Sequence, residues 1–472
     1  MNLNKICIVG GGSAGWMTAS ILLKHFGKTK EITVIEADIP RIGVGESTTQ
    51  FFNNFIKYLG LKDKEWMPPC NATYKHSVKF TKFNLEGSFH YPFGTGNNIK
   101  YTDYFNWRHN NNVNPMTFSR VMSPIVDVIE DNKLYPDYFD CQVGYHVDAL
   151  LFAEYLKNEY AIPKGITYIR GEVIDYESGW DGISKLYLSD GKYIEADLFI
   201  DCTGFKGLLM NHVGSKWIDW RTELKNDSTW AVRLPYTDKK AQLRPYTECT
   251  GMSAGWMWDV PTWEHRGVGY NYCSQYISDE EALQEFKLKL DQDIPENCFR
   301  LLKWQTGIRE EVWCKNVIGI GLSSGFIEPL ESGGLYSVHE FLFKLIQVLP
   351  KDIKKWNGFI RTQFNTAVTD RFTEFKNFVV SHYTMGFRDD TPFWKEYTNM
   401  NDVCGYPHLL TLHNKQLGLM NDLEEGYAAL LGGYKYDIIT ESWESNWMPL
   451  VTPNYSYPNA YDYYKTHLYV NV

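Results

Sequence analysis

The sequence predicts an α/β fold in which a Rossmann-like domain is interleaved with a β-sheet domain and a mainly helical C-terminal region. Three observations lead to this prediction. A strand, a glycine-rich turn, a helix and a second strand follow one another within residues 5–36. Apolar strands that run into glycines return at residues 196–204 and 317–322, and several β-like runs lie between residues 230 and 276. Because these segments alternate along the chain, the domains are expected to be discontinuous.

The remaining elements follow from hydrophobic periodicity. Helices are predicted at residues 16–26, 53–59, 146–160, 279–289, 335–348 and 352–383. Strands are predicted at residues 166–173, 185–188 and 193–200, with a hairpin turn at residues 189–191. Residues 64–145 follow no clear period and are predicted to be irregular. We therefore assign residues 1–60, 146–215 and 300–350 to the Rossmann-like domain, and residues 61–145, 216–299 and 351–472 to a substrate-binding region.

Composition and charge exclude several classes of protein. The 472 residues are 44% hydrophobic and 22% charged, as in an ordinary globular protein. The net charge of −10 and the lack of a Lys/Arg-rich run argue against nucleic-acid binding. Nine scattered cysteines without a Cys-x-x-Cys spacing argue against a disulfide framework or a metal site and favour a cytoplasmic protein. No apolar run reaches the roughly 18 residues of a membrane span, so no membrane association is expected.

The turn at residues 10–15 has the Gly-x-Gly-x-x-Gly spacing of a dinucleotide-binding fingerprint. Gly10 permits the tight turn, Gly12 lets the backbone approach a pyrophosphate, and Gly15 lets the helix pack on the strand. The N–H groups at the start of the helix suit phosphate, and the carboxylate that ends the second strand suits a ribose. The predicted cofactor contacts of this unit are Gly10, Gly12, Ser13, Ala14, Gly15 and Glu36.

The later strands favour FAD over a nicotinamide cofactor. Their return to the first sheet is similar to FAD-binding proteins of the glutathione-reductase type, in which the strand containing Val173 would pass near the adenine. No second Gly-x-Gly-x-x-Gly unit is present to bind NAD(P)H. Reduced flavin would therefore have to be supplied by a separate flavin reductase.

Four further motifs occur in order along the chain. They are PRIGVGEST at residues 40–48, GWMWDVP at 255–261, FIEPLES at 326–332 and RDDTPFW at 388–394. Together with the glycine-rich turn they resemble the flavin-dependent tryptophan halogenase family, over residues 6–394. The family's marker is Gly-Trp-x-Trp-x-(Ile/Val)-Pro. The resemblance implies that Trp256 and Trp258 form a wall on the flavin side that keeps organic substrate away from the flavin.

The resemblance also implies a reaction. Reduced FAD, oxygen and a halide ion yield hypohalous acid, which passes through the protein interior to a lysine beside an electron-rich, indole-like aromatic substrate. In the YKHSVKF stretch at residues 74–80 that lysine is Lys75, with Lys79 as the alternative. Its ammonium can donate a hydrogen bond to hypohalous acid, or its neutral amine can form a haloamine. Glu331 matches the glutamate that stabilises the cationic σ-complex and accepts its proton.

Further positions are assigned by the same resemblance. Ser332, Gly333 and Gly334 match the halide-binding turn, and Phe93 matches an aromatic ring that contacts the substrate alongside Glu331. The flavin contacts outside the first unit are Ser47, Val173, Gly321, Leu322 and Leu335. A homodimer is left open.

Two departures from the family pattern shape the expected specificity. Gly333 stands where the family commonly has threonine, so the halide pocket should be wider and offer one fewer donor. Chloride is the most strongly hydrated of the three halides, so its binding should be weakened most by the loss of a donor. Bromide or iodide is therefore expected to be preferred. The aromatic and acidic stretch at residues 443–447 does not align with the family's tryptophan-gripping segment. Free tryptophan is therefore not the expected substrate.

Three other classes of function remain open from the sequence. A flavin monooxygenase shares the first steps of the chemistry, and a non-catalytic flavin-binding protein shares the fingerprint. A serine hydrolase is the remote alternative, because residues 321–325 fit the pattern Gly-x-Ser-x-Gly, with Asp389 and either His408 or His413 following.

Overall fold

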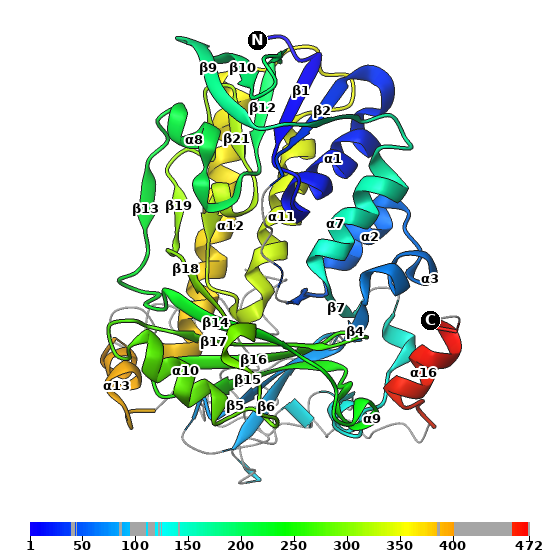
Figure 1. Cartoon of the computed structure of the whole chain (residues 1–472), viewed down its shortest axis with the longest axis vertical. Helices are drawn as coiled ribbons and strands as arrows, with labels where there is room; N and C mark the ends of the chain where they lie inside the picture. Colours follow the sequence, from blue (N-terminus) through cyan, green and yellow to red (C-terminus); the bar gives the residue numbers. More distant parts are fainter. Residues whose placement is uncertain are drawn as a thin grey trace.

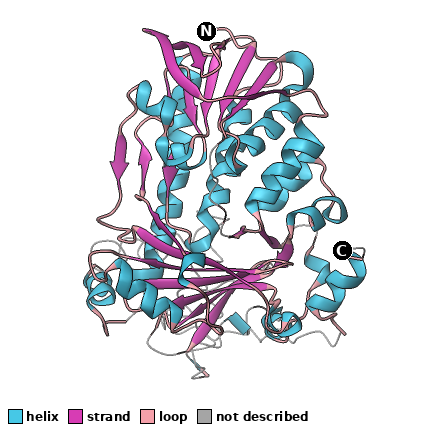
Figure 2. Cartoon of the chain, in the orientation of Figure 1, coloured by secondary structure: helices cyan, strands magenta, loops and turns pink. Residues whose placement is uncertain are grey.

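The computed structural model describes residues 1–38, 43, 45–84, 87–94, 110–111, 119–120, 123, 125–139, 142–384, 388–400 and 456–470. Two large β-sheets lie at opposite ends of the molecule, as Figure 2 shows. Helices α11 (Gly333–Val348) and α12 (Gly358–Thr384) run lengthwise from one sheet toward the other (Figure 1). The fold is mixed α/β, with a Rossmann-like sheet and a separate antiparallel sheet, as predicted.

The six-stranded sheet is built around the first strand of the chain. Its order is β20-β21-β12-β1-β2-β8. Strand β1 (Lys5–Val9) pairs in parallel with β2 (Glu31–Glu36) and with β12 (Leu198–Asp201), and all but its first residue are buried. The outer strands are β8 (Thr167–Arg170), β21 (Val317–Gly319) and the antiparallel β20 (Trp313–Cys314). Parallel strands buried on both faces explain the continuous apolar runs in the sequence.

The seven-stranded sheet has the order β18-β14-β17-β16-β15-β5-β6. All neighbours are antiparallel except β5 and β15. Its strands are β5 (Ser77–Thr81), β6 (Ser88–Pro92), β14 (Ser228–Leu234), β15 (Tyr246–Gly251), β16 (Gly255–Pro261), β17 (Arg266–Tyr272) and β18 (Arg300–Lys303). Because β18 belongs here, this sheet extends past residue 300, where we placed the domain boundary. The division of the chain into two discontinuous regions stays a prediction.

Three small sheets complete the strands. One of them, β3-β7-β4, lies between the two large sheets and joins β3 (Glu46–Ser47) and β4 (Thr73–Lys75) to β7 (Gly144–Val147). The others are β11-β10-β9, made of β9 (Val173–Gly179), β10 (Gly182–Leu188) and β11 (Tyr193–Glu195), and β13-β19-β22, made of β13 (Trp217–Asp219), β19 (Gly307–Arg309) and β22 (Gly325–Phe326).

Helices cover the six-stranded sheet and flank the seven-stranded one. The longer ones besides α11 and α12 are α1 (Ser13–Phe26), α2 (Phe52–Leu59), α7 (Ala149–Tyr155), α10 (Asp279–Lys287), α13 (Pro392–Asn399) and α16 (Ala460–His467). In the described part of the chain, no helix is both long and apolar enough to cross a membrane.

Several predicted elements differ from the structure, and the helix predicted at residues 352–383 begins only at Gly358. The helix predicted at residues 146–160 begins only at Ala149, because Asp148 caps it by accepting the N–H of Leu150 at 3.0 Å, and the residues before the cap form β7. Each of the strands predicted at residues 166–173 and 193–200 is divided between two sheets. The first is divided between β8 and the start of β9, and the second between β11 and β12. Residues 64–145 are not irregular throughout. They contribute β4, β5 and β6, whose polar residues hid the strand pattern.

Candidate active site

The glycine cradle, which we define as Gly10, Gly11, Gly12 and Gly15, joins the carboxyl end of β1 to the start of α1. An added β-carbon on Gly15 would overlap the carbonyl oxygen of Gly10, whereas one on Gly12 would meet no atom within 4 Å. The turn is therefore packed on its inner side and has space on its outer side. Helix α1 begins without a side-chain cap or an acidic residue in its first turn. This arrangement fits the pyrophosphate of a dinucleotide such as FAD.

Three other predicted cofactor residues lie close to the cradle or its sheet. Glu36 is buried at the end of β2, and its Oε2 accepts a hydrogen bond from Lys157 Nζ at 2.9 Å. A ribose at this position would share Glu36 with that lysine. Gly321 lies against the start of α1, since an added β-carbon would be 2.9 Å from the Cβ of Ala14. Val173 is buried under the sheet, in the same apolar cluster as Val9.

The side chain of Lys75 is enclosed between the two large sheets. It is 1% exposed. Its Nζ donates hydrogen bonds to Ser332 Oγ at 2.9 Å, to the carbonyl oxygen of Thr48 at 3.1 Å and to Ser47 Oγ at 3.2 Å, and it lies 5.1 Å from the ring centroid of Phe93. Within the described part of the chain Nζ makes no ion pair. We call Ser47, Lys75, Glu331 and Ser332 the lysine cluster.

The protonation of Lys75 is tuned by its surroundings. Burial lowers the pKa of Lys75 to about 8, while the nearby Glu331 carboxylate acts in the opposite direction. An ammonium has three N–H donors, and three oxygen acceptors surround it. The lysine is therefore an ammonium at neutral pH that can lose its proton in mildly alkaline solution.

Two consecutive residues with left-handed backbone shape the cluster. Glu331 has φ 62° and ψ 21°, and Ser332 has φ 62° and ψ 34°, immediately before α11. Non-glycine residues occupy this region at a cost of roughly 1–2 kcal/mol each. The turn directs Ser332 Oγ to Ser47 Oγ at 2.5 Å and to Lys75. Glu331 points instead toward α12, where its Oε1 lies 3.0 Å from Nε2 of His382.

The halide turn predicted at residues 332–334 is at the N-terminus of α11, but the space beside Gly333 differs from our expectation. A β-carbon on Gly333 would lie 2.9 Å from Cε1 of Phe375. The space that the missing side chain leaves is therefore occupied by this ring, and the expected widening of the pocket is wrong on that side. Gly334 faces Glu46, whose pKa burial raises to about 7. Leu335, in the next position, is buried in α11.

The two tryptophans of β16, Trp256 and Trp258, are both buried, and their ring centroids are 5.9 Å apart. Trp256 donates its indole N–H to Glu328 Oε1 at 3.0 Å, and the hydroxyl of Tyr383 donates to the same oxygen. Asn226 donates to Glu328 Oε2 at 3.0 Å. Burial raises the pKa of Glu328 to about 7, although these three donors favour the carboxylate. The orientation of Trp256 is thus held by a buried polar network.

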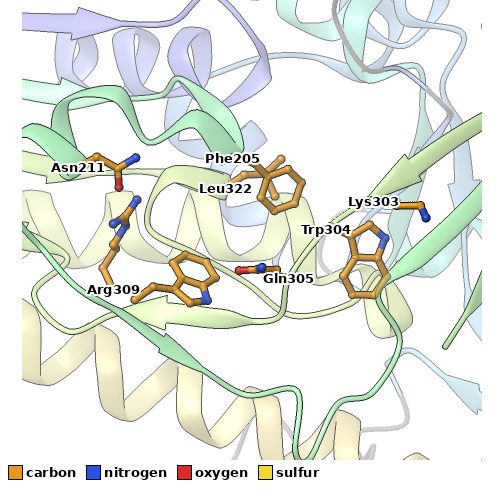
Figure 3. A pocket seen from close by; sticks show the side chains of 8 residues that line it. Phe205, Asn211, Lys303, Trp304, Gln305, Arg309 and Leu322 are labelled. Carbon is orange, nitrogen blue, oxygen red and sulfur yellow. The ribbon is translucent and has the colours of Figure 1, made fainter. Parts of the chain in front are cut away.

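A cavity of about 440 Å³ lies beside the β13-β19-β22 sheet. Figure 3 shows Arg309 and Asn211 at one side of it and Trp304 and Lys303 at the other. Its lining contains Leu322 but no member of the lysine cluster. The lysine cluster is therefore not part of this cavity, whereas Leu322, a predicted flavin contact, lines it.

Two alternatives from the sequence are not supported by the geometry. Lys79 faces away from the cluster and pairs with Glu130 at 2.9 Å. The hydroxyl of Ser323, the nucleophile of the hydrolase reading, donates to the carbonyl oxygens of Ile320 and Asp201. His408 and His413 lie outside the described residues, as do residues 443–447 and most of the 40–44 stretch.

Sequence reasoning missed several groups of the site. His382 and Tyr383 are on α12 and Asn226 precedes β14, so no local motif connects them to residues 326–332. Glu328 and Glu46 are inside motifs that the sequence analysis quoted. Their partners, and therefore their roles, appear only when the sheets are assembled.

A dinucleotide cradle on a mainly parallel sheet, together with an enclosed lysine and glutamate, indicates an enzyme that uses a dinucleotide cofactor. The chain belongs to the tryptophan halogenase family, whose model matches residues 5–465. It is an FAD-dependent halogenating enzyme with halide as co-substrate. The residues that hold FAD and those that handle the halide remain predictions.

Similar proteins support this assignment. The tryptophan 6-halogenase SttH of Streptomyces toxytricini is 34% identical over 84% of this chain and 81% of its own. The tryptophan 7-halogenase RebH of Lentzea aerocolonigenes is 32% identical over 88% of this chain and 83% of its own. The structure of Xcc4156, a flavin-dependent halogenase from Xanthomonas campestris, superposes with a TM-score of 0.83 at 27% identity and covers 92% of this chain and 89% of its own.

Proposed function

We propose that this enzyme delivers hypohalous acid through Lys75 to an electron-rich, indole-like aromatic substrate. The observation that carries the proposal is the enclosure of Lys75 beside the predicted halide turn, with hydroxyl and carbonyl oxygens as its hydrogen-bond acceptors. A buried structural lysine would be expected to pair with a carboxylate, as the buried Lys376 does with Glu223.

Reduced FAD, bound at the glycine cradle and supplied by a separate reductase, provides with oxygen the oxidising equivalents that convert halide to hypohalous acid. The Lys75 ammonium then donates a hydrogen bond to the oxygen of hypohalous acid. As the carbon–halogen bond forms, the halogen–oxygen bond breaks, and the oxygen leaves as water with a proton from Lys75. Glu331 stabilises the cationic ring and takes the proton that the halogenated carbon loses. The sum is arene and hypohalous acid giving aryl halide and water.

The tryptophan wall, Trp256 and Trp258, is proposed to separate the flavin from the substrate. Its rigidity supports this role, because the indole N–H of Trp256 is held by the Glu328 carboxylate. Phe93 is proposed to contact the aromatic substrate, which fits its place beside Lys75. We keep free tryptophan out of the proposed substrates. An indole or phenol without the amino-acid group should react at least as well, and a large preference for tryptophan in direct competition would contradict this.

The proposal is tested by separating hypohalous acid formation from its use. Purified enzyme, FAD, a flavin reductase and NADH are supplied with each halide in turn, and products are identified by mass spectrometry. Lys75→Ala should still bind FAD and oxidise reduced flavin but should lose aromatic halogenation by at least about 100-fold. Lys79→Met, which changes a nearby ion-paired lysine, serves as the matched control and should retain activity.

Three outcomes would overturn parts of the proposal. Unchanged halogenation by Lys75→Ala would remove the lysine from the reaction. An oxygenated product formed without halide would favour the monooxygenase alternative. Efficient turnover with FAD and NADH but no reductase would contradict the need for a partner enzyme.

A further inference from the structure

A second titratable side chain lies against the carboxylate of Glu331. Nε2 of His382 is 3.0 Å from Glu331 Oε1, and the exposed fractions of the two side chains are 0% and 2%. The imidazole lies between the rings of Phe80 and Phe378, with centroids 5.0 Å and 4.9 Å away. The pair is therefore closed off from water and held in one orientation.

Counting hydrogen atoms shows that this contact contains a proton. Nδ1 of His382 lies 2.9 Å from the carbonyl oxygen of Phe378. A carbonyl oxygen only accepts, so Nδ1 carries a hydrogen, and a neutral ring would leave Nε2 as an acceptor. A carboxylate is also only an acceptor. The contact between Nε2 and Glu331 Oε1 therefore requires one more proton, bound to the ring or to the carboxyl group.

We propose that His382 is a positioning residue for Glu331, which holds a shared proton on Oε1 and leaves the other carboxyl oxygen to face the substrate. The inference rests on the proposed function, because it concerns the same glutamate. A partner fixed at one carboxyl oxygen holds Glu331 in one orientation, so that its other oxygen can stabilise a cationic ring. The left-handed turn at Glu331 and the helix α12 fix the two partners from separate elements.

The proton balance is closed. When the halogenated carbon loses its proton, the electron pair of the C–H bond returns to the ring and the proton moves to the Glu331 carboxylate. The proton shared with His382 remains on the pair, so the histidine is not consumed. The other titratable groups that interact electrostatically with Glu331 are Lys75 on β4 and Cys249 on β15. Of these, Lys75 is the group that can take up the released proton.

The experiment compares two substitutions with a matched control. His382→Phe removes both ring nitrogens and should lower aromatic halogenation by at least about 100-fold. His382→Gln can still donate an amide N–H to Glu331 but cannot share a proton, so it should recover part of the activity. His339→Phe is the control, since His339 is also fully buried and its Nε2 has no hydrogen-bond partner in the described structure.

Each assay is run with the aromatic substrate and with a small diketone that traps hypohalous acid. We expect His382→Phe to lose halogenation of the aromatic substrate. Its rate of halogenating the trap should stay within about threefold of that of the unmodified enzyme. Equal loss in both assays, equal loss in His339→Phe, or no recovery of aromatic halogenation in His382→Gln would overturn the inference. Failure of the proposed function is a distinct result, because the unmodified enzyme would then not halogenate the aromatic substrate, or Lys75→Ala would still halogenate it.

Discussion

The glycine cradle and the lysine cluster are two regions of the molecule that are built in opposite ways. The cradle comes from one continuous stretch, residues 10–15, and four of its residues are glycines that offer only backbone. The cluster comes from three segments, with Ser47 on β3, Lys75 on β4 and Glu331 and Ser332 before α11. The cradle needs the absence of side chains, whereas every side chain of the cluster has a partner. We therefore expect substitutions in the cradle to act by steric overlap. Substitutions in the cluster should act by changing hydrogen bonds and proton transfer.

The largest expected effect tests the first half of this comparison. In Gly15→Ala the new β-carbon overlaps the backbone of Gly10, so the protein without FAD should lose about 3 kcal/mol of stability or more. In Gly12→Ala the β-carbon meets no protein atom, so the same protein should be about as stable as before and only FAD binding should weaken, by about 1–3 kcal/mol. Thermal unfolding and FAD fluorescence titration measure the two effects. Equal destabilisation by both variants would contradict the described packing.

The second prediction concerns Glu328 and stability. Burial raises the pKa of Glu328 to about 7 from its ordinary 4.5. A folded-state pKa above the unfolded one gives stability that is present below about pH 4.5 and is lost as the pH rises through about 7, at most about 3 kcal/mol here. Glu328→Gln should remove this pH dependence. The check is the difference in unfolding midpoint between the two proteins from pH 4.5 to 7.5, and a constant difference would contradict it.

The third prediction uses the pKa of Lys75 to distinguish its two chemical roles. If the ammonium acts, the rate of aromatic halogenation relative to trapping should fall tenfold per pH unit above about 8. If a haloamine forms, the same ratio should rise with pH and level off above about 8. We expect the fall, because three oxygen acceptors surround Nζ. Ser332→Ala removes one acceptor and should move the transition to lower pH.

The smallest expected effect concerns the halide. Gly333 offers no hydroxyl donor, so bromide should be preferred over chloride by several-fold, on the order of 1 kcal/mol, in competition at equal concentrations. Because Phe375 occupies the space beside Gly333, a threonine is best introduced together with Phe375→Leu, with Phe375→Leu alone as the control. The double variant should shift toward chloride. Predominant chlorination by the unmodified enzyme would reject the preference.

The same comparison explains how much the sequence could predict. The strand, turn and helix around Gly10 to Gly15 were predictable, because their contacts are local and each glycine has a steric reason. Family motifs pointed to Lys75 and Glu331. The structure places both in one cluster, although their roles stay predictions. Long-range pairing was not predictable. Strand β5 was missed because its polar residues hid the strand pattern, and its pairing with β15, more than 160 residues away, leaves no local signal.

The partners of the catalytic candidates were also beyond local reasoning. Nothing in the sequence around His382 distinguishes it from other residues of a helix. Only the packing of α12 against the turn at Glu331 reveals its contact. The crowding of Gly333 by Phe375 has the same origin, since nothing in the sequence relates these two positions. Both depend on how helices from separate parts of the chain pack, which periodicity alone does not determine.

The left-handed turn at Glu331 and Ser332 has a consequence for selection. Glycine at either position would relieve roughly 1–2 kcal/mol of backbone cost, so a library screened only for folded, abundant protein should enrich it there. A library screened for halogenated product should remove the same variants. At positions 331 and 332 the glycine variants should therefore be enriched in the stability screen and depleted in the activity screen. Selection for stability alone would be a poor guide to activity in this enzyme.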